Sequence, residues 1–303
     1  MYYGQSRSKS ARLASHIAKK NEEDTFWSDS EKSTLWYAVP EVASYDSPLI
    51  KTTFIQMFED SETKEFIKEA IEQADSWALQ TWYNVAKAVM SWFSFTHTDM
   101  NGILQRGSML VVSSEQFSLL LEHADIQLTD KNESRMIDLG AGDGKVTLKM
   151  SHNFQHIFAT ETSKPMKSLL NSRNITVLPV ENWSKDLEDK FDLISCLNLL
   201  DRCDNPKDII EEVKAALKPN GLFLVALVYP FKPFVEARNS RTPSQDLGVI
   251  GDNFIDQVES FVNIMKNEFG FKLKSWTRVP YLCEGDLVHS IYYLDDALYL
   301  FNL

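Results

Sequence analysis

The chain has few cysteines, and their spacing organises nothing. Cys196, Cys203 and Cys283 are the three cysteines among 303 residues. This odd, sparse set is too small for a disulfide scaffold or for a zinc site of four thiolates. His152 and His156 stand four positions apart in the sequence, with no third ligand nearby. We therefore expect a protein that needs no metal.

Long apolar runs and an excess of positive charge are also missing. No run of 18 apolar residues exists, and the stretch from Met1 to Lys20 is polar and basic, unlike a secretory signal. We expect no membrane insertion and a cytoplasmic setting by default, with association with an organelle left open. The net charge of −12 argues against a protein that binds nucleic acid, because such proteins usually present a basic face to it. An apolar content of 44% suffices for a globular core.

What the sequence does contain is a glycine turn between a strand and a helix. The short apolar segment 136–139 precedes Gly140, Gly142 and Gly144, and a helical pattern begins at Lys145. Glycine frees the backbone to turn and lets a ligand approach main-chain N–H groups at the start of a helix. The spacing Asp-x-Gly-x-Gly-x-Gly differs from the Gly-x-Gly-x-x-Gly that binds dinucleotides.

Acidic residues around this turn indicate the kind of ligand. Asp138 leads the glycines and Asp143 lies within the turn, so a pyrophosphate would be repelled and a cationic, amine-bearing ligand favoured. Glu161 ends the next predicted strand, 23 positions after Asp138, close to the spacing at which an acidic residue binds ribose hydroxyls. The pattern predicts an adenosyl ligand without phosphates. Here the sequence resembles the seven-strand, Rossmann-like, S-adenosylmethionine-dependent (class I) methyltransferases; the alternative is a glycine turn without a ligand.

Strands and helices alternate over the second half of the chain. The predicted strands are 136–139, 156–160, 175–178, 191–197 and 221–228, and the predicted helices are 144–151, 163–172 and 206–217. This alternation indicates a parallel, doubly wound α/β sheet whose ligands bind beyond the carboxyl ends of the strands. Strands at 271–279 and 290–301 would form the reversed hairpin that closes the resembled fold. We assign residues 111–303 to this Rossmann-like domain.

The first third of the chain has a different composition. Residues 1–34 are rich in Ser, Lys and Glu, and we expect a flexible segment there. Apolar residues recur at helical spacing between 50 and 95, which predicts two or three amphipathic helices. We assign 35–110 to a helical cap, an N-terminal extension of the methyltransferase fold. Its tryptophans, interpreted as core with a substrate channel as the alternative, are Trp36, Trp77, Trp82 and Trp92.

Arg106 stands in the segment 101–109, where glycines are expected to interrupt helix. A guanidinium near the adenosyl site would pair with the methionyl carboxylate of the ligand through two hydrogen bonds. The equal alternative is a loop arginine that is paired with a surface acid.

The predicted strand 191–197 leads directly into Asn198, Asp201 and Arg202, where methyltransferases of this fold place residues that meet the substrate. The Asn/Asp-Pro-Pro-Tyr sequence that enzymes acting on nucleic-acid bases or on glutamine often carry there is absent, which disfavours that chemistry. An imidazole must present one nitrogen lone pair to the sulfonium methyl group, and a carboxylate that accepts the proton of the other nitrogen fixes that tautomer. Asp201 suits this role; the alternatives are an ion pair with Arg202 or a helix cap before Pro206.

Several long sequence blocks are similar to those of the DREV-type methyltransferases, and together they span roughly residues 35–303. The blocks are 102–109, 138–144, 159–161, 194–204, 226–236, 280–286 and 292–296. Members of that family are protein-histidine N-methyltransferases that modify the pros nitrogen (Nδ1) of histidine in His-x-His motifs, x being a small residue, and so form 1-methylhistidine. The resemblance implies S-adenosyl-L-methionine as the cofactor, S-adenosyl-L-homocysteine as its product, and proteins that contain His-x-His as partners.

Carried over to matching positions, the resemblance implies a role for individual residues. Cofactor binding falls to Asp138, Gly140, Ala141, Gly142, Glu161, Asn198 and Arg106. Substrate binding falls to Asn198, Asp201, Tyr229, Phe231, Tyr292 and Tyr293, with Asp201 and Asn198 as the catalytic residues. For the block that holds Tyr229 and Phe231, packing beneath the final hairpin is an equal alternative. Residues 1–34 do not match and stay unassigned.

The acidic composition suits a histidine-rich peptide, which is neutral to cationic. The protein's own six histidines include no His-x-His, so we expect no automethylation at such a motif. We expect a monomer. Two rival functions stay open: a small-molecule methyltransferase with an enclosed pocket under the cap, and a non-catalytic scaffold that binds S-adenosylmethionine.

Overall fold

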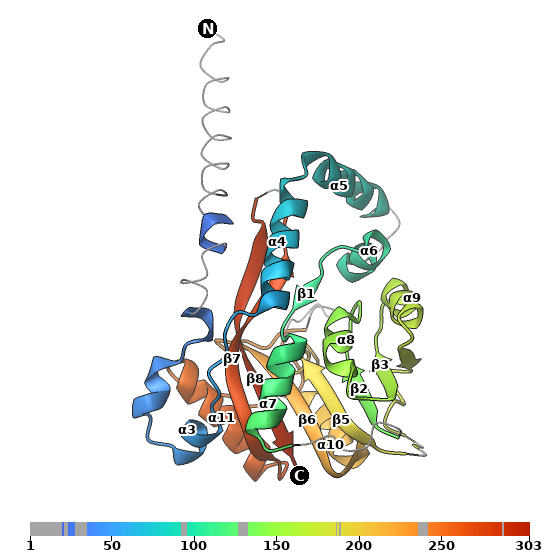
Figure 1. The fold of residues 1–303 in the computed structure, drawn as a ribbon. Coiled ribbons are helices and arrows are strands. Elements are labelled where there is room, and N and C mark those ends of the chain that lie inside the picture. The colour runs from blue at the N-terminus through green and yellow to red at the C-terminus, as the bar shows by residue number, and fades with distance from the viewer. Residues whose placement is uncertain are drawn as a thin grey trace.

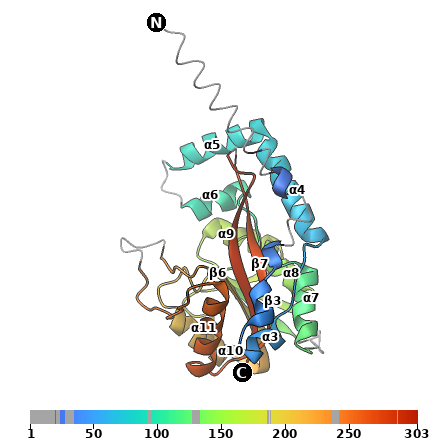
Figure 2. The ribbon, with the colours of Figure 1, turned by 90° about the vertical axis from the view of Figure 1, so that its left-hand side faces the viewer.

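The computed structural model describes residues 20, 24–27, 35–91, 96–126, 133–185, 187, 189–235, 242–286 and 288–303. Over these residues the chain forms an eight-stranded sheet with helices on both faces (Figures 1 and 2). The strand order is β1-β7-β8-β6-β5-β2-β3-β4. The expected flexible segment 1–34 lies outside the described residues apart from Lys20 and 24–27, and so does Trp92.

The predicted α/β alternation is confirmed in the parallel half of the sheet. Each strand pairs in parallel with its neighbour in the order β6-β5-β2-β3-β4. The strands are β2 (Arg135–Leu139), β3 (His156–Thr160), β4 (Thr176–Leu178), β5 (Phe191–Leu197) and β6 (Leu217–Tyr229). The helices that connect them are α8 (Lys145–Ser151), α9 (Lys164–Ser172) and α10 (Pro206–Ala216). The carboxyl ends of β2, β3 and β5 therefore lie along one edge, where ligands of such sheets bind.

An antiparallel hairpin completes the sheet. After α11 (Phe254–Asn267), strands β7 (Lys272–Glu284) and β8 (Ile291–Asn302) pair with each other, and β8 also pairs with β6. The two-residue strand β1 (Met109–Leu110) pairs antiparallel with β7 and raises the strand count to eight, where the sequence predicted seven. Two residues are too short for an alternating pattern, so only the tertiary pairing with β7 defines this strand.

The N-terminal third forms helices as predicted, with one correction. The elements are η1 (Pro40–Ser44), α3 (Pro48–Thr53), α4 (Ser61–Asp75), α5 (Trp77–Ser91), α6 (His97–Leu104) and α7 (Ser114–His123). Glycine was expected to interrupt helix in 101–109, but α6 continues through Gly102 to Leu104, and its C-cap, Gln105, has a φ of 50°. A Cβ at position 102 would lie 2.9 Å from Cβ of Pro165 at the start of α9. Gly102 therefore allows two helices to approach closely, and does not break one.

The cap helices share their cores with the sheet. One core joins α10, α11 and residues Val39, Val42 and Ile50 to one face of the sheet, and a second joins α4 and α7 to the other. Trp36 is buried, but 72% of Trp77 and 62% of Trp82 are exposed, so their interpretation as core was wrong. No helix in the described segments is long and apolar enough to cross a membrane.

Candidate functional site

The predicted glycine turn is present at the carboxyl end of β2, and residues 140–144 are called the glycine loop. Gly140, Gly142 and Gly144 have φ values of 74°, 56° and 78°, in the left-handed region that favours glycine. The main-chain N–H groups of Gly140 and Ala141 both donate to the Thr160 carbonyl, at 3.0 and 3.1 Å. The end of β3 therefore holds the first half of the loop in place.

Asp138 lies beneath the glycine loop. Its carboxylate accepts hydrogen bonds from Thr147 Oγ1 in α8 at 2.5 Å and from Ser195 Oγ in β5 at 2.7 Å. Burial raises the pKa of Asp138 to about 6; the hydrogen bonds from Thr147 and Ser195 oppose this rise, and the nearby charge of Glu161 adds to it. Asp138 thus links β2, α8 and β5 at the site where the sequence predicted a cofactor contact, and that contact itself stays a prediction.

Glu161 joins the glycine loop to the start of α9. Its Oε1 accepts from the main-chain N–H groups of Thr162 at 2.6 Å and Ser163 at 2.8 Å, and its Oε2 accepts from the N–H of Gly142 at 3.0 Å. A carboxylate oxygen can accept more than one hydrogen bond, so Oε2 keeps capacity for a ribose hydroxyl. The Glu161 side chain is buried, and it contacts the glycine loop directly through the N–H of Gly142.

Arg106 is buried between the cap and the β7–β8 hairpin. Its guanidinium donates to the Gly285 carbonyl at 2.8 Å and to Gln73 Oε1 at 3.1 Å, and it lies 4.6 Å from the ring centroid of Tyr83. Glu284, whose side chain is 7% exposed, has its Oε2 3.6 Å from Nε of Arg106. Arg106 therefore has an acidic partner in this structure, and pairing with a methionyl carboxylate stays a prediction that requires new contacts.

The segment that follows Arg106 reaches the glycine loop. Ser108 Oγ contacts Asp143 Oδ2 at 3.5 Å and accepts a short hydrogen bond from Lys145 Nζ. A Cβ added at Gly142 would meet only the terminal methyl of Met109, at 3.9 Å. The loop thus presents an open main-chain surface next to β1.

Asn198 and Asp201 leave the carboxyl end of β5 and turn into the protein. Asn198 adopts a φ of 56°, and its Nδ2 reaches across the end of β6 to donate to Asp296 Oδ2 on β8 at 2.8 Å. Asp201 is buried, and its Oδ2 accepts from Arg202 Nε at 2.8 Å. Oδ1 of Asn198, Asp201 and Asp296 is in each case a buried oxygen that has no hydrogen-bond partner among the described residues. We call these three oxygens the acceptor cluster.

The electrostatics of the acceptor cluster favour a ligand that brings donors or positive charge. Burial raises the pKa of Asp201, and the adjacent Arg202 opposes that change. Burial raises the pKa of Asp296 well above its usual value, and the charge of Asp201 contributes in the same direction while the bond from Asn198 opposes it. Unpaired buried acceptors are rare in folded proteins and often mark a binding site.

The four predicted aromatic residues fall into two groups. Tyr229 and Phe231 are buried in the core. The Tyr229 hydroxyl lies 2.6 Å from that of Tyr299 on β8, which agrees with the alternative that this block packs beneath the final hairpin. Tyr292 and Tyr293, at the start of β8, are 44% and 48% exposed. Contact of all four with a substrate stays a prediction.

Exposed Tyr292 and Tyr293 make different contacts. The Tyr292 hydroxyl donates to Asp286 Oδ2 at 3.0 Å. The ring of Tyr293 packs edge-on against Trp27, with centroids 5.2 Å apart, and stacks on Trp36. Tyr292 therefore belongs to the hairpin end, whereas Tyr293 anchors the N-terminal segment to β8.

Sequence reasoning missed several residues of this site. Asp296 lies within the matching block 292–296, but the sequence pattern assigns it no role, and it assigns none to Thr147 and Ser195, which hold Asp138. Arg202 was treated only as a rival partner of Asp201, although its guanidinium also lies 4.2 Å from the ring centroid of Phe234. The long matching block was a signal for Asp296; nothing in the local pattern pointed to the two hydroxyls.

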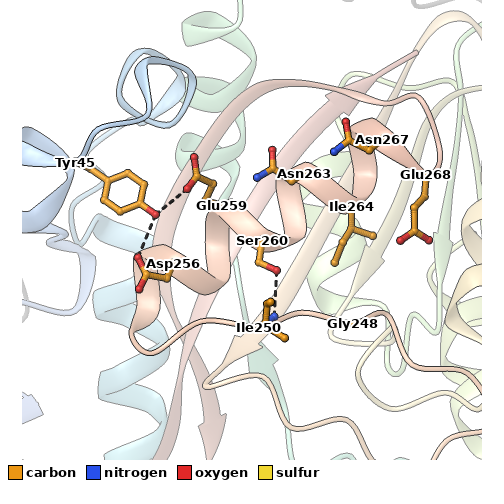
Figure 3. Close-up of a pocket in the computed structure, with 10 residues that line it drawn as sticks. All are labelled: Tyr45, Gly248, Ile250, Asp256, Glu259, Ser260, Asn263, Ile264, Asn267 and Glu268. Atoms are coloured by element: carbon orange, nitrogen blue, oxygen red, sulfur yellow. Dashed lines mark hydrogen bonds between the residues drawn. The ribbon is translucent and has the colours of Figure 1, made fainter.

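Two hollows lie near these elements. One, of about 260 Å³, separates α4 from the start of α8 and is lined by Ser108, Met109 and Lys145 beside the glycine loop. The other, of about 550 Å³, runs along α11, where the Tyr45 hydroxyl contacts Asp256 and Glu259 (Figure 3). None of the residues predicted for cofactor or substrate lines this second hollow. Over the described ranges, no three His, Cys, Asp or Glu side chains cluster as a metal site would require.

Solved structures that share features of this chain include three methyltransferases. An S-adenosylmethionine-dependent methyltransferase from Clostridium acetobutylicum ATCC 824 has 16% identity and a TM-score of 0.39 over 63% of this chain and 90% of that one. A putative O-methyltransferase from Klebsiella pneumoniae has 12% identity and a TM-score of 0.40 over 74% and 100%. The N-methyltransferase NodS from Bradyrhizobium japonicum WM9 has 12% identity and a TM-score of 0.38 over 62% and 94%.

The family comparison covers far more of the chain. The family profile described as DREV methyltransferase matches residues 36–302, which include the glycine loop, Glu161 and the acceptor cluster. The resemblance found in the sequence is thereby confirmed. The chain belongs to the DREV methyltransferase family and is a methyltransferase with a Rossmann-like fold that uses S-adenosylmethionine.

Proposed function

We propose that this methyltransferase modifies the pros nitrogen, Nδ1, of histidine in His-x-His motifs of protein substrates. The observation that carries the proposal is the pair of buried oxygens, Asp201 Oδ1 and Asn198 Oδ1, which have no partner in the described part of the chain at the carboxyl end of β5. They are acceptors, and a neutral imidazole has one N–H to donate while its other nitrogen acts as the nucleophile.

The residues at the end of β2 fit the cofactor. The glycine loop exposes main chain where side chains would intrude, and Glu161 Oε2 at its rim has acceptor capacity for a ribose hydroxyl. Asn198 lies across from them at the end of β5, the strand that pairs with β2. In this assignment Asp138 also supports the loop from below, through its hydrogen bonds with Thr147 and Ser195.

The chain's own residues prepare the nucleophile. Arg202 Nε holds Oδ2 of Asp201, which leaves Oδ1 to accept the Nε2–H of the target imidazole. This tautomer carries the lone pair on Nδ1. S-adenosylmethionine supplies a methyl group whose bond to sulfur breaks, with the electron pair staying on sulfur, as the new N–CH3 bond forms. The charge that develops on the imidazole ring is balanced by the Asp201 carboxylate, and the Nε2 proton is later lost to water.

The protonation state of Asp201 is part of this mechanism. The ionised carboxylate is needed to accept the Nε2–H and to balance the imidazolium. Burial raises the pKa of Asp201, and the Arg202 guanidinium pulls it back towards the ionised form. The hydrogen bond between the two thus keeps a buried carboxylate available as an acceptor.

Charge supports a peptide substrate of this kind. The net charge of −12 favours neutral to cationic segments, and a His-x-His segment is one of these. Proteins that expose His-x-His, with a small residue between the histidines, are therefore the proposed partners, and the enzyme would act as a monomer.

The test is incubation of a short peptide that contains His-Ala-His with the protein and S-adenosylmethionine, followed by fragment mass spectrometry. We expect a gain of one methyl group on a histidine, assigned to Nδ1 by NMR, and its loss in Asp201→Ala and in a peptide whose histidines are alanine. Cofactor binding without any methylated peptide would refute the proposal. It would favour a small-molecule substrate, or a non-catalytic scaffold if no acceptor is ever methylated.

A further inference from the structure

Asp296 is a buried carboxyl group that none of the assigned roles uses. It lies on β8, is fully buried, and faces Val228 of β6 and Val279 of β7 in the sheet register. A carboxyl group among apolar strands loses hydration and is costly unless it makes specific hydrogen bonds. Among the described residues, Asn198 Nδ2 donates a hydrogen bond to Oδ2 of Asp296, at 2.8 Å. Asn198 therefore supplies the side-chain hydrogen bond that holds this buried carboxyl group.

The bond between the two residues determines which end of the Asn198 amide is free. An amide has a donor end, Nδ2, and an acceptor end, Oδ1, and these ends exchange places when the group rotates by half a turn. An ionised Asp296 can only accept, so it holds Nδ2. A protonated Asp296 with its proton on Oδ1 still accepts at Oδ2, so the observed orientation is compatible with the raised pKa that burial gives this group. Asn198 Oδ1 is then left as the buried, unpartnered oxygen observed among the described residues.

The backbone of Asn198 prevents the side chain from settling elsewhere. Its N–H donates to the Ala226 carbonyl at 3.0 Å, and its φ of 56° directs the chain sharply away from β5. Asparagine tolerates this left-handed conformation better than most residues. Main chain and side chain are thus both tied to the β6–β8 part of the sheet, and rotation about the amide is the remaining freedom.

We propose that Asp296 is a positioning residue that locks the Asn198 amide with its oxygen towards the substrate, so that the site presents two acceptors, from Asn198 and Asp201. The locked orientation stands on the structure alone, and its effect on catalysis rests on the proposed histidine substrate. With both acceptors in place, the site selects a ring that donates one N–H, and it disfavours a substrate that offers only acceptors. Without Asp296, the amide turns and its Nδ2 competes for the nucleophilic lone pair.

The first test needs no substrate. In protein labelled with 15N at asparagine, the side-chain NH2 signals of Asn198 are identified by their loss in Asn198→Ala. We expect them to shift towards free-amide values in Asp296→Ala and to stay near their original positions in Asp296→Asn, whose carbonyl oxygen still accepts. Asp295→Ala, a change at the neighbouring carboxylate that pairs with Arg278, is the matched control and should leave them unchanged. Unchanged signals in Asp296→Ala would overturn the proposal.

The second test measures turnover of a His-Ala-His peptide. We expect kcat/KM to fall about tenfold in Asp296→Ala and by no more than about threefold in Asp296→Asn, with the Kd for S-adenosylhomocysteine unchanged. The double variant Asn198→Ala/Asp296→Ala should lose no more than Asn198→Ala alone, because the two residues act as one unit. Multiplying losses would overturn the positioning role. If the wild-type protein leaves the peptide unmodified, the histidine proposal fails, and the NMR result still decides the role of Asp296.

Discussion

The carboxyl ends of β2 and β5 are neighbours in the sheet, and their polar groups are in opposite states. At the end of β2, Asp138 has both carboxylate oxygens hydrogen-bonded to the protein, and so does Glu161 at the end of the adjacent strand β3. At the end of β5, the acceptor cluster keeps three buried oxygens without partners in the described segments. Asp138 and Glu161 thus have their hydrogen bonds before any ligand arrives, whereas the acceptor cluster at the end of β5 does not.

This difference indicates that the paired groups mainly stabilise the fold, whereas the unpaired groups are available for the reaction. A buried acceptor without a donor costs about 1–3 kcal/mol, and a ligand that brings a donor removes that cost. The cost of the acceptor cluster is therefore tolerated for its function, as is usual at active sites. Changes at the end of β2 should alter unfolding and cofactor binding, whereas changes at the end of β5 should alter turnover.

The largest effect is expected at Asp201. In Asp201→Asn the carboxylate that receives the Nε2–H is lost while its shape is kept, so kcat for a His-Ala-His peptide should fall about 100- to 1,000-fold. Binding of S-adenosylhomocysteine should stay within about twofold, because the glycine loop is untouched. Kinetics by mass spectrometry and calorimetry measure the two quantities.

The matched control for this change is Asp189→Asn, an exposed aspartate that pairs with Arg135 at the opposite end of β2. It should leave kcat and binding unchanged. A loss of cofactor affinity in Asp201→Asn as large as the loss of kcat would show that the two strand ends are not separate, and so would break the comparison.

The second effect is a pH dependence of stability at Asp138. Its folded pKa of about 6 lies above the usual 3.8, so folding favours the protonated form, and stability present at low pH is lost as the pH rises from about 4 to about 6. A rise of the pKa from 3.8 to about 6 corresponds to about 3 kcal/mol in the free energy of unfolding. Asp138→Asn cannot ionise, so its free energy of unfolding relative to wild type should improve by about that amount between pH 4 and pH 7.5.

Urea unfolding at the two pH values measures this difference, and Asp189→Asn again serves as the control with a pH dependence parallel to wild type. Parallel curves for Asp138→Asn would mean that the carboxylate under the loop titrates normally. The hydrogen bonds from Thr147 and Ser195 would then be strong enough to offset its burial.

Much of the fold was predictable because it depends on local patterns. Apolar strands, the glycine turn and helical periodicity placed β2 to β6 and α8 to α10 within a few residues of their observed bounds. Strand ends that depend on pairing were not predictable: β7 runs to Glu284, five residues beyond the predicted end, because β8 and β1 pair with it there. Trp77 and Trp82 looked like core because periodicity shows that a helix has an apolar face, not that something covers it.

The site was predictable as far as its residues lie at or just after the carboxyl ends of predicted strands. Asp138 lies in a predicted strand, Gly142, Glu161, Asn198 and Asp201 follow predicted strands, and the structure brings all five to one edge. Asp296 comes from the middle of an antiparallel strand, where a carboxyl group has no local reason to be. Its contact with Asn198 arises from the order β5-β6-β8, which no spacing in the sequence encodes.

A third prediction compares two glycines of the loop. Gly144→Ala places a Cβ 2.6 Å from Leu170 Cδ2 in addition to a φ of 78°, so the free energy of unfolding should fall by about 2–3 kcal/mol. Gly142→Ala has a similar φ but open space, so it should lose only about 1 kcal/mol. The new Cβ at position 142 would enter the open space beside Met109, where we expect the cofactor to bind. For the same loss of stability, this variant should therefore lose more affinity for S-adenosylhomocysteine than Gly144→Ala. Equal ratios of affinity loss to stability loss would mean that the loop acts only as a structural turn.

The smallest effect is expected at Tyr292, which lies at the hairpin end away from both strand ends. If its ring forms a wall for the peptide, Tyr292→Ala should raise the KM for a His-Ala-His peptide about threefold to tenfold, in line with about 1 kcal/mol of aromatic contact. Tyr292→Phe keeps the ring and loses only the hydroxyl bond to Asp286, which is part of an exposed turn, so its KM should stay within about twofold. An equal rise of KM in both variants would assign the effect to the turn at Asp286. Loss of the hydroxyl alone would then account for the whole effect, and the ring would make no contribution. A KM unchanged in both would confine peptide recognition to the end of β5.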